Sequence, residues 1–509
     1  MVMGETARQS KRWWAVALLC LVSLILGMDD SVMNLALPSI AEEFEANISQ
    51  MQWAINAYLL TTAALLLAMG ALGDRFGRKR TLLLGMILFA LGSLSAMLST
   101  SMGMLIACRA VMGLGCAVVW PQTLSIIRAT FEDAKERAVA IGVWTGVTAL
   151  SYGIGPVVGG ILLQYFHWTS VFFINIPLSL VGLAGGYFLV RESMDPDAPR
   201  LDLLGAVLSG AALFSLVYGI IEAGRLSWTE RSVILWLGVG VIMLVLFAVS
   251  ELRSDHPMLP MRFFKNMSFT GATIPMAMVL MAGGAIMFFL SQYFQSVRGY
   301  SPMQTALMML PGPAMTFLTA TAAAPLANAI GTKFTVSLGL FVSGIGLFLL
   351  SLLTTGTQWY ALVGASIIQG AGFGLAFSPA ANSIMGSLPV KKAGIGSALD
   401  NTVQQIGYVL GVAALGAVLN AVYRDRVADL QVVVSLPQEA REAILSSIQG
   451  ANVVAGEFPS DISQQIVQGS SEAFTSGVER ALIIGVAIMI IAVLFTLIVL
   501  PSRIRRPEE

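Results

Sequence analysis

The chain has 509 residues, of which 56% are hydrophobic and 11% are charged, and its mean hydropathy of +0.79 is far above that of a soluble domain. The formal net charge is zero and the basic residues form no long block, which excludes nucleic acid as a partner. The composition therefore predicts an all-α integral membrane protein.

Fourteen apolar stretches are long enough to cross a bilayer, which needs roughly 20 residues in a helix. In chain order they occupy residues 13–37, 51–72, 81–99, 104–125, 138–164, 169–190, 201–222, 232–250, 268–295, 303–325, 333–354, 358–386, 396–421 and 479–500. Basic residues precede the first stretch, but it has no small-residue cleavage site. It therefore predicts a first transmembrane helix and not a removable signal peptide.

The basic residues of the connections predict the orientation. With the N-terminus inside, the inner loops and both tails hold 21 Lys and Arg residues, whereas the outer loops hold 7. The positive-inside rule then places both tails, 1–12 and 501–509, in the cytoplasm, and the protein in the cytoplasmic (inner) membrane. The segment 422–478 is polar and predicts a long extracellular piece, which fits either a cap on the outer vestibule or a passive linker.

Two internal echoes predict a repeat. The first pairs GALGDRFGRK (70–79) with APLANAIGTK (324–333), and the second pairs GLGCAVVWP (113–121) with GFGLAFSP (372–379). Both offsets are about 255 residues, although six helices occupy only about 190, so a two-helix insert separates two six-helix halves related by a parallel repeat. The predicted parts are an N-terminal bundle at 13–190, the insert with its linkers at 191–267 and a C-terminal bundle at 268–500.

Five motifs resemble those of one family. GALGDRFGRKR (70–80), LIACRAVMGLG (105–115) and GVWTGVTALSYGIGPVVGG (142–160) are similar to the inner-loop, buried-arginine and antiporter motifs of the major facilitator superfamily, with Ser151 in place of a usual glycine. DDSVMNLALP (29–38) and HWTSVFFINIP (167–177) resemble motifs of its fourteen-helix drug:proton antiporter branch. The resemblance covers essentially the whole chain and implies a major facilitator fold with 14 transmembrane helices.

The inner-loop motif supplies a candidate gate. Gly70 and Gly77 permit close helix approach and a tight turn. Asp74 can pair with Arg75, with Arg78 or with a helix N-terminus of the other half. Such pairs would hold the cytoplasmic side shut and part when it opens. The alternative is a solvated charge cluster that only sets the topology.

Two further motifs predict coupling and switching. An arginine inside a membrane helix costs roughly 2.5–3.5 kcal/mol, so Arg109 needs a buried acceptor or a water-filled cavity. The resemblance implies that Arg109 takes part in proton coupling; a snorkelling arginine is the alternative. In the fifth helix the residues that weaken the helix or allow close approach are Gly142, Gly155, Pro156, Gly159 and Gly160. The resemblance implies a conformational switch of an exporter, and a purely structural packing helix is the alternative.

Intramembrane acids indicate the substrate. Asp400 lies about nine residues beyond Lys391, hence roughly 13 Å into the bilayer at 1.5 Å per residue. It shares a helix face with Gln404, and Asn401 lies on the next face. Gln404 stands where the family often has an arginine, and Asp400 is an added acid, which resembles the pumps for quaternary ammonium antiseptics and cationic dyes. Asn56 occupies a position where that subset can carry a further acid.

Asp29 and Asp30 lie in the outer part of the first helix. Neighbours in a helix differ by 100°, so the two acids point in different directions. The family motif favours Asp29 as a proton-coupling carboxylate, together with Asp400 and Arg109. Periodicity instead places Asp30 and Asn34 on the polar stripe, with Asp30 as a second cavity or vestibule acid. Two interfacial acids that simply reach water are the alternative.

The candidate substrate site combines these acids with polar and aromatic side chains. Its members are Asp29, Asp30, Asn34, Trp53, Asn56, Tyr58, Asp400, Asn401 and Gln404. A carboxylate that holds either a proton or an organic cation, but not both, would couple efflux to proton entry. Aromatic rings can hold flat cations, although such residues more often belong to the core.

The sequence thus predicts a proton-coupled multidrug efflux antiporter for organic cations, and not an enzyme. There is no GxxxxGK[ST] phosphate loop, and the two histidines form no metal or catalytic cluster, so neither a cofactor nor a metal is expected. The expected partners are small organic cations, protons and membrane lipids, and the expected unit is a monomer. The alternatives are export of a neutral, zwitterionic or natural-product substrate, such as an antibiotic, a lipid or an amino acid, and a non-transporting membrane sensor.

Overall fold

The computed structural model describes residues 2–131, 133–195, 202–254, 257, 259, 261–387 and 393–501. Within these ranges all regular elements are helices, and they provide 14 stretches long and apolar enough to cross a membrane. The predicted all-α membrane protein with 14 spans is therefore confirmed.

The first nine helices are α1 (Val2–Glu43), α2 (Ile48–Phe76), α3 (Arg78–Met97), α4 (Met102–Thr130), α5 (Ala134–Tyr165), α6 (Ser170–Phe173), α7 (Asn175–Leu189), α8 (Leu203–Arg225) and α9 (Arg231–Arg253). They are followed by the 3-10 helix η1 (Met261–Lys265), α10 (Met267–Gln292), the π-helix η2 (Tyr293–Val297), α11 (Pro302–Met309), α12 (Pro311–Ile330), α13 (Thr332–Ser351), α14 (Trp359–Gly386), α15 (Ala393–Ala428), α16 (Gln431–Val434), α17 (Gln438–Ser446), α18 (Ile448–Ala455) and α19 (Ser460–Val499). Helices α11 and α12 together form one interrupted span.

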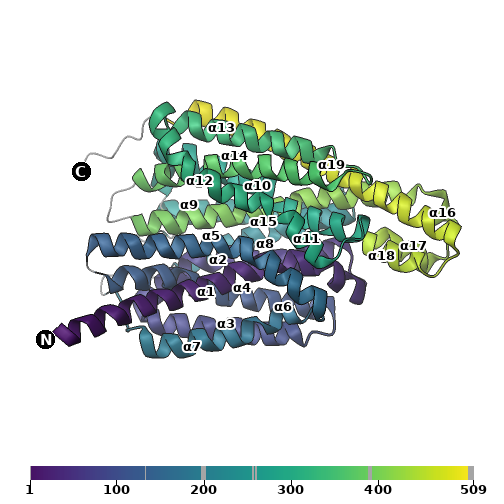
Figure 1. The fold of residues 1–509 in the computed structure, drawn as a ribbon. Helices are drawn as coiled ribbons and strands as arrows, with labels where there is room; N and C mark the ends of the chain where they lie inside the picture. The colour runs from purple at the N-terminus through teal and green to yellow at the C-terminus, as the bar shows by residue number, and fades with distance from the viewer. Residues whose placement is uncertain are drawn as a thin grey trace.

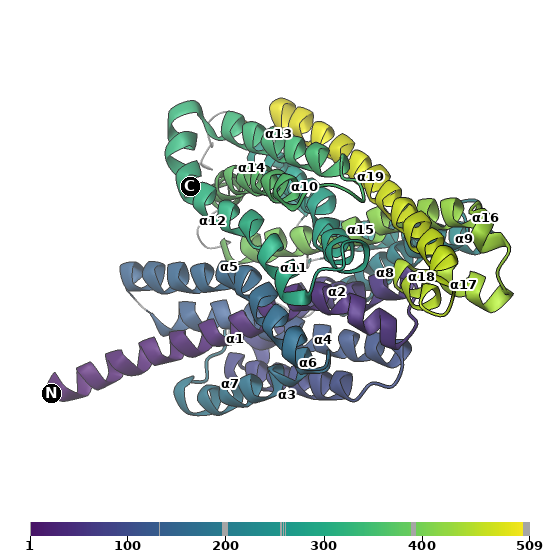
Figure 2. The ribbon, with the colours of Figure 1, turned by 45° about the vertical axis from the view of Figure 1, so that its right-hand side comes forward.

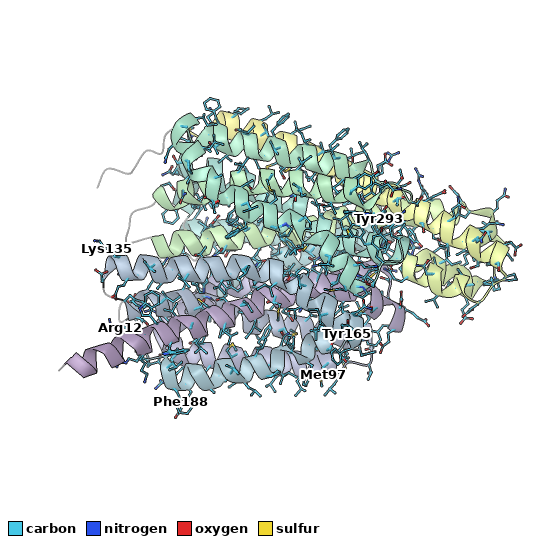
Figure 3. All side chains as sticks on the ribbon, viewed as in Figure 1. Arg12, Met97, Lys135, Tyr165, Phe188 and Tyr293 are labelled. Atoms are coloured by element: carbon cyan, nitrogen blue, oxygen red, sulfur yellow. The ribbon has the colours of Figure 1, made fainter. Side chains whose placement is uncertain are left out.

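The long helices run side by side in one bundle (Figure 1). Because the number of spans is even, the start of α1 and the end of α19 lie on the same side of the bundle, here called the terminal side. Helices α16 to α18 lie at the opposite end, the distal side (Figure 1). Figure 3 shows Arg12 and Lys135 near the terminal side, and Met97 and Tyr165 toward the distal side. Leu91 is one of many large apolar side chains exposed between these ends, as expected for a surface that faces lipid.

Helix contacts repeat between the two halves. Helix α4 packs on α2 and α3 as α14 packs on α12 and α13, and α1 packs on α5 as α10 packs on α15. The first sequence echo aligns Gly77 with Gly331, and both have a positive φ, of 109° and 91°. Each glycine links two spans, α2 to α3 and α12 to α13, in a conformation that favours glycine. The repeat seen in the sequence therefore extends to the backbone.

The insert packs on the seam between the halves. Helix α8 contacts α9, and it also contacts α2 of the N-terminal half and α15 of the C-terminal half (Figure 2). Trp53 of α2 lies against Phe214 and Tyr218 of α8, with ring centroids 5.7 and 5.9 Å away. Trp236 of α9 joins the cluster, 4.9 Å from Tyr218. Aromatic packing thus attaches the insert to the bundle.

The segment 422–478, expected as a long extracellular piece, is largely helical, because α15 and α19 both extend into it and α16 to α18 lie between them. The Tyr423 hydroxyl donates to the Ile444 carbonyl at 2.9 Å. Gln449 of α18 donates to Ser296 Oγ of η2 at 2.9 Å, and α18 also contacts α1. The segment therefore packs on the distal ends of both halves.

One face of α5 shows which side of the bundle is open. Gly142, Gly146, Gly153 and Gly160 share this face, because their spacings are close to whole numbers of helical turns. A Cβ atom added to Gly160 would lie 2.8 Å from Ala306 Cβ of α11, in the other half. A Cβ atom added to any of the other three would meet no described atom within 4 Å. Among the described residues the halves are therefore in contact on the distal side and apart along α5 toward the terminal side, which is called open below.

Candidate functional site

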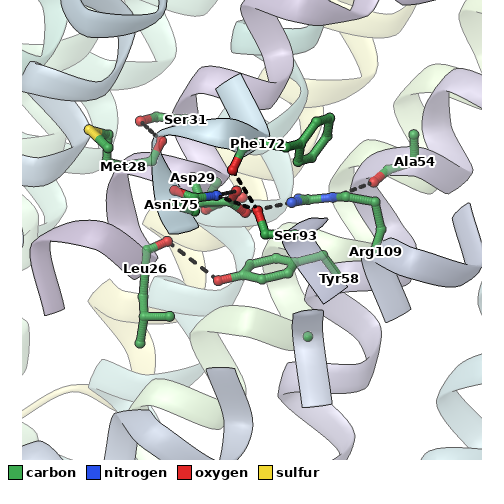
Figure 4. A network of polar contacts seen from close by, with 12 residues as sticks. Leu26, Met28, Asp29, Ser31, Ala54, Tyr58, Ser93, Arg109, Phe172 and Asn175 are labelled. Carbon is green, nitrogen blue, oxygen red and sulfur yellow. Dashed lines mark hydrogen bonds and ion pairs between the residues drawn. The ribbon is translucent and has the colours of Figure 1, made fainter. Parts of the chain in front are cut away.

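A buried ion pair lies inside the N-terminal half. Asp29 Oδ2 of α1 and Arg109 Nη1 of α4 are 2.5 Å apart (Figure 4). Arg109 is 0% exposed and Asp29 is 4% exposed. A lone charge at such a depth costs several kcal/mol, so each side chain supplies the partner that the other needs. The Arg109 side chain therefore does not extend to the membrane surface. Asp29 is the buried acceptor that an arginine at this depth was expected to need.

Neutral groups complete the ion pair (Figure 4). Asn175 Nδ2 of α7 donates to Asp29 Oδ1 at 2.7 Å. Arg109 Nε donates to the Ala54 carbonyl of α2 at 3.1 Å. The guanidinium lies over the Tyr58 ring, 4.4 Å from its centroid. Tyr58 is thus a cation–π partner of Arg109, and the network joins α1, α2, α4 and α7.

Two members of the network had no predicted role. Asn175 belongs to the HWTSVFFINIP motif, and Ser93 lies in the apolar stretch of α3. Ser93 Oγ donates to the Phe172 carbonyl at 2.9 Å and accepts from Asn175 Nδ2 at 3.2 Å (Figure 4). For Asn175 the sequence does offer a signal, which is an amide side chain inside an apolar run. A polar group in a membrane helix requires a partner.

Asp30 lies beside this network with one oxygen unpartnered. It is 7% exposed, and no described donor is within hydrogen-bond reach of its Oδ1. Asn34 Nδ2 donates to the backbone carbonyl of Asp30 at 3.3 Å, while Asn34 Oδ1 also has no described partner. The two sequence arguments thus select different acids: the family motif selects Asp29, which is held by Arg109, and the polar stripe selects Asp30, which retains a free acceptor.

The C-terminal half contributes Asp400 on α15. Its Oδ2 accepts from Gln404 Nε2 at 2.9 Å, so the two side chains share a helix face as predicted. Asp400 is 7% exposed, and its Oδ1 has no partner among the described residues. Asn401 is half-buried at the adjacent position. A second intramembrane carboxylate with an unpartnered oxygen therefore lies in the other half of the molecule.

Two more of the predicted site residues, Trp53 and Asn56, lie on α2 outside the ion-pair network. Trp53 packs against Phe214 and Tyr218 of the insert, away from the ion pair. Asn56 is 0% exposed, and neither of its amide atoms has a described partner. It is one helical turn from Gln52, whose side chain bonds to α15, so it lies on the face of α2 that meets the other half.

The inner-loop motif makes its described contacts with the N-terminal half and with the linker that follows it, where Glu192 accepts from the backbone N–H of Lys79 at 3.0 Å. Arg78 Nε donates to Asp74 Oδ1 at 2.7 Å, one of the predicted pairings. Arg75 lies by the ring of Phe76, 5.7 Å from its centroid, and Gly70 packs on α4. The Asp74–Arg78 pair lies within the motif itself, so this pairing does not bridge the halves.

The glycines of the fifth-helix motif pack tightly near the distal end. A Cβ atom added to Gly155 would overlap Ser31 Oγ, and one added to Gly159 would lie 2.9 Å from Val32 Cγ1; both neighbours are in α1. Pro156 lies between these two contacts, inside the helix. The close approach of α5 and α1 thus requires residues without a side chain at positions 155 and 159. The role of the motif in a conformational switch stays a prediction.

Twelve spans in two similarly packed halves, a two-span insert and charges buried inside the bundle define a membrane transporter and not an enzyme. A model of the Major Facilitator Superfamily matches residues 19–412. The chain therefore belongs to the major facilitator superfamily.

Relatives match nearly the whole chain. The multidrug efflux pump LfrA of Mycolicibacterium smegmatis is 33% identical over 96% of this chain and 96% of its own. The methyl viologen resistance protein SmvA of Salmonella typhimurium is 32% identical over 91% of this chain and 93% of its own. The tetracenomycin C resistance and export protein of Streptomyces glaucescens is 29% identical over 98% and 94%.

Solved structures support the fold. A bacterial homolog of the human lysosomal transporter Spinster, in an inward-facing and unoccupied conformation, superposes with a TM-score of 0.65 at 16% identity, covering 96% of this chain and 97% of that one. A D-xylose-proton symporter superposes with a TM-score of 0.63 at 14% identity, covering 96% and 98%. At this identity the likeness concerns the fold alone.

Proposed function

We propose that this protein is a multidrug efflux antiporter that exchanges organic cations for protons across the cytoplasmic membrane. The observation that carries the proposal is the presence of two buried intramembrane carboxylates, Asp30 and Asp400, each with an oxygen that has no described partner. An unpaired carboxylate in a membrane interior is costly until a proton neutralises it or a cation pairs with it. One such group lies in each half.

The ion pair gives a means of exchange. When ionised, Asp29, Asp30 and Arg109 together carry one net negative charge, which can be balanced by one organic cation or by one proton. A proton on Asp29 or Asp30 brings this local charge to zero, and Arg109 then repels a bound cation. Because one cation leaves for each proton that enters, no net charge crosses the membrane, so the pH gradient drives this exchange and the membrane potential does not.

The orientation follows from the basic residues. With 21 Lys and Arg residues on the terminal side and 7 on the distal side, the positive-inside rule makes the terminal side cytoplasmic. The open terminal side would then load substrate from the cytoplasm. Two relatives support export of toxic compounds, since one is named as a multidrug efflux pump and the other for resistance to methyl viologen, an organic dication.

A second candidate is export of a natural product without a fixed positive charge. The relative named for tetracenomycin C resistance and export matches 98% of this chain, which favours that candidate. The two candidate functions differ in their dependence on acidic side chains, because a neutral substrate does not need a carboxylate partner.

The test uses purified protein in liposomes with an imposed pH gradient and ethidium as the probe. We expect gradient-driven ethidium movement by wild type, loss of at least 80% of it in Asp400→Asn, and no change in Glu442→Gln, an exposed acid of α17. No ethidium movement by wild type would overturn export of cations, and movement that ignores the pH gradient would overturn proton coupling. Full activity of Asp400→Asn would remove Asp400 from the site.

A further inference from the structure

A glutamine of α2 crosses the seam between the halves. Gln52 is 0% exposed, and its Nε2 donates to the carbonyls of Val412 at 2.9 Å and Ala413 at 3.2 Å. Helix α2 belongs to the N-terminal half and α15 to the C-terminal half. Because an amide in a membrane span needs a partner, these hydrogen bonds favour the arrangement in which the two helices touch.

Gly416 makes room for this glutamine. A Cβ atom added to Gly416 would overlap Gln52 Nε2 and lie 2.8 Å from its Cδ. The φ angle of Gly416 is not positive, so the backbone does not require glycine there and the missing side chain supplies space. One turn further along α15, Asn420 Nδ2 donates to Ser49 Oγ of α2 at 3.1 Å, with both side chains buried.

The same arrangement also occurs inside a single half. Gln122 of α4 is 0% exposed and donates to the Met69 carbonyl of α2 at 2.9 Å. A Cβ atom added to Gly73 would overlap the Gln122 amide. In both places a glutamine fills the space beside a glycine and bonds to the carbonyl four residues before that glycine. One copy joins two helices of one half, and the other joins the two halves.

The closed seam also buries polar atoms that lack partners. Gln52 Oε1 has no partner among the described residues, and neither has either amide atom of Asn56, one turn nearer the terminal side on the same face of α2. Water that enters when the distal side opens can hydrate all three atoms. The seam therefore contains hydrogen bonds that favour closure and unpaired atoms that favour opening.

We propose that Gln52 and Gly416 form a lock, here called the seam lock, that sets the population of the distal-closed state. The insert covers this lock, because Trp53, next to Gln52, packs on α8, and a Cβ atom added to Gly224 of α8 would lie 2.6 Å from Ala417 Cα. Its effect on export rests on the proposed function, whereas its effect on the conformational equilibrium does not.

The test measures the distance between spin labels on the distal side of each half. Gly103→Cys and Gly356→Cys place the labels at exposed positions with no described atom within 4 Å of an added Cβ, in a background with the three native cysteines replaced by alanine. Double electron–electron resonance in lipid nanodiscs then gives the fraction of molecules with the distal side open. We expect Gln52→Ala and Gly416→Ala each to raise that fraction at least threefold.

The double variant and a matched control make the test specific. Gln52→Ala/Gly416→Ala should open the distal side no more than Gln52→Ala alone, because the alanine methyl then has no amide to displace. Gln122→Ala should lower the Tm as Gln52→Ala does and leave the open fraction unchanged.

An unchanged open fraction in Gln52→Ala, additive effects in the double variant, or equal opening by Gln122→Ala would each overturn the seam lock. If Gly416→Ala does not fold, the comparison of Gln52→Ala with Gln122→Ala decides. Neither substrate nor a pH gradient is needed, so failure of ethidium transport by wild type would be a separate result.

Discussion

In the N-terminal half a fully buried arginine meets a carboxylate, whereas the C-terminal half has an uncharged side chain at the matching position. Gly92 of α3 faces Met112 of α4 as Gly346 of α13 faces Gln369 of α14, and this alignment pairs Arg109 with Ser366. The acid of the C-terminal half, Asp400, is held by a neutral amide, Gln404. The halves therefore share helix packing but not the distribution of charge.

This difference separates what the repeat preserves from what it changes. Gly77 and Gly331 keep the same positive φ at the same junction, and the helices around them pack alike. Backbone geometry is shared because both halves face the same packing problem in the membrane. The buried ion pair, in contrast, has no counterpart among the described residues of the C-terminal half. Three sets of substitutions can break or sharpen this comparison.

The largest effect is expected at the matched pair Arg109 and Ser366. Arg109→Ala leaves Asp29 buried without its counter-charge and should cost about 3–5 kcal/mol, with loss of transport. Ser366→Ala removes a buried hydroxyl group and should cost about 1 kcal/mol, with transport retained. Thermal unfolding in detergent and ethidium transport measure both. Equal losses of stability at the two positions would show that the halves do not differ in this way.

The next effect concerns the two adjacent acids. Asp29→Asn leaves Arg109 charged and unpaired, and we expect a loss of about 2 kcal/mol, because the asparagine can still accept hydrogen bonds. Asp30→Asn removes a charge that has no bonded partner, so stability should stay within about 0.5 kcal/mol while ethidium export falls. Unfolding and transport measured on the same preparations give the comparison. A stable, active Asp29→Asn variant would contradict the assignment of Asp29 to the buried pair.

The smallest difference between matched positions is expected where the halves agree. Gly77→Ala and Gly331→Ala each force alanine into a backbone conformation that costs of order 1–3 kcal/mol. The loss should be larger for Gly77, because its added Cβ would also lie 2.7 Å from Glu192 Oε1. The Tm values of the two single variants test this order. If only one variant is destabilised, the junctions are not equivalent in the folded protein.

Much of the fold could be predicted from the sequence. Long apolar runs give the spans directly, because the bilayer sets their length, and the echoes at 70–79 and 324–333 reveal the repeat. The shared face of Asp400 and Gln404 follows from helical periodicity alone. These are local properties of one helix or of two aligned segments.

The partners of buried side chains could not be predicted in the same way. Asp29 and Arg109 are 80 residues apart, and periodicity says which way each points but not what it meets. Trp53 packs on α8, and nothing in the sequence of α2 reveals that the insert lies against that face, whereas its place in the substrate site stays a prediction. The interruption between α11 and α12, and the open terminal side, depend likewise on tertiary packing.

The ion pair also has a consequence for how the protein is made. Helix α1 leaves the ribosome before α4 exists, and the intervening 80 residues take roughly 4–16 s to synthesise at 5–20 residues per second. During that time Asp29 has no Arg109, and α1 carries a carboxylate that lipid does not tolerate well. A nascent chain must therefore keep this part of α1 near water or protein until α4 arrives, and only then can both helices settle in the bilayer as a neutral unit.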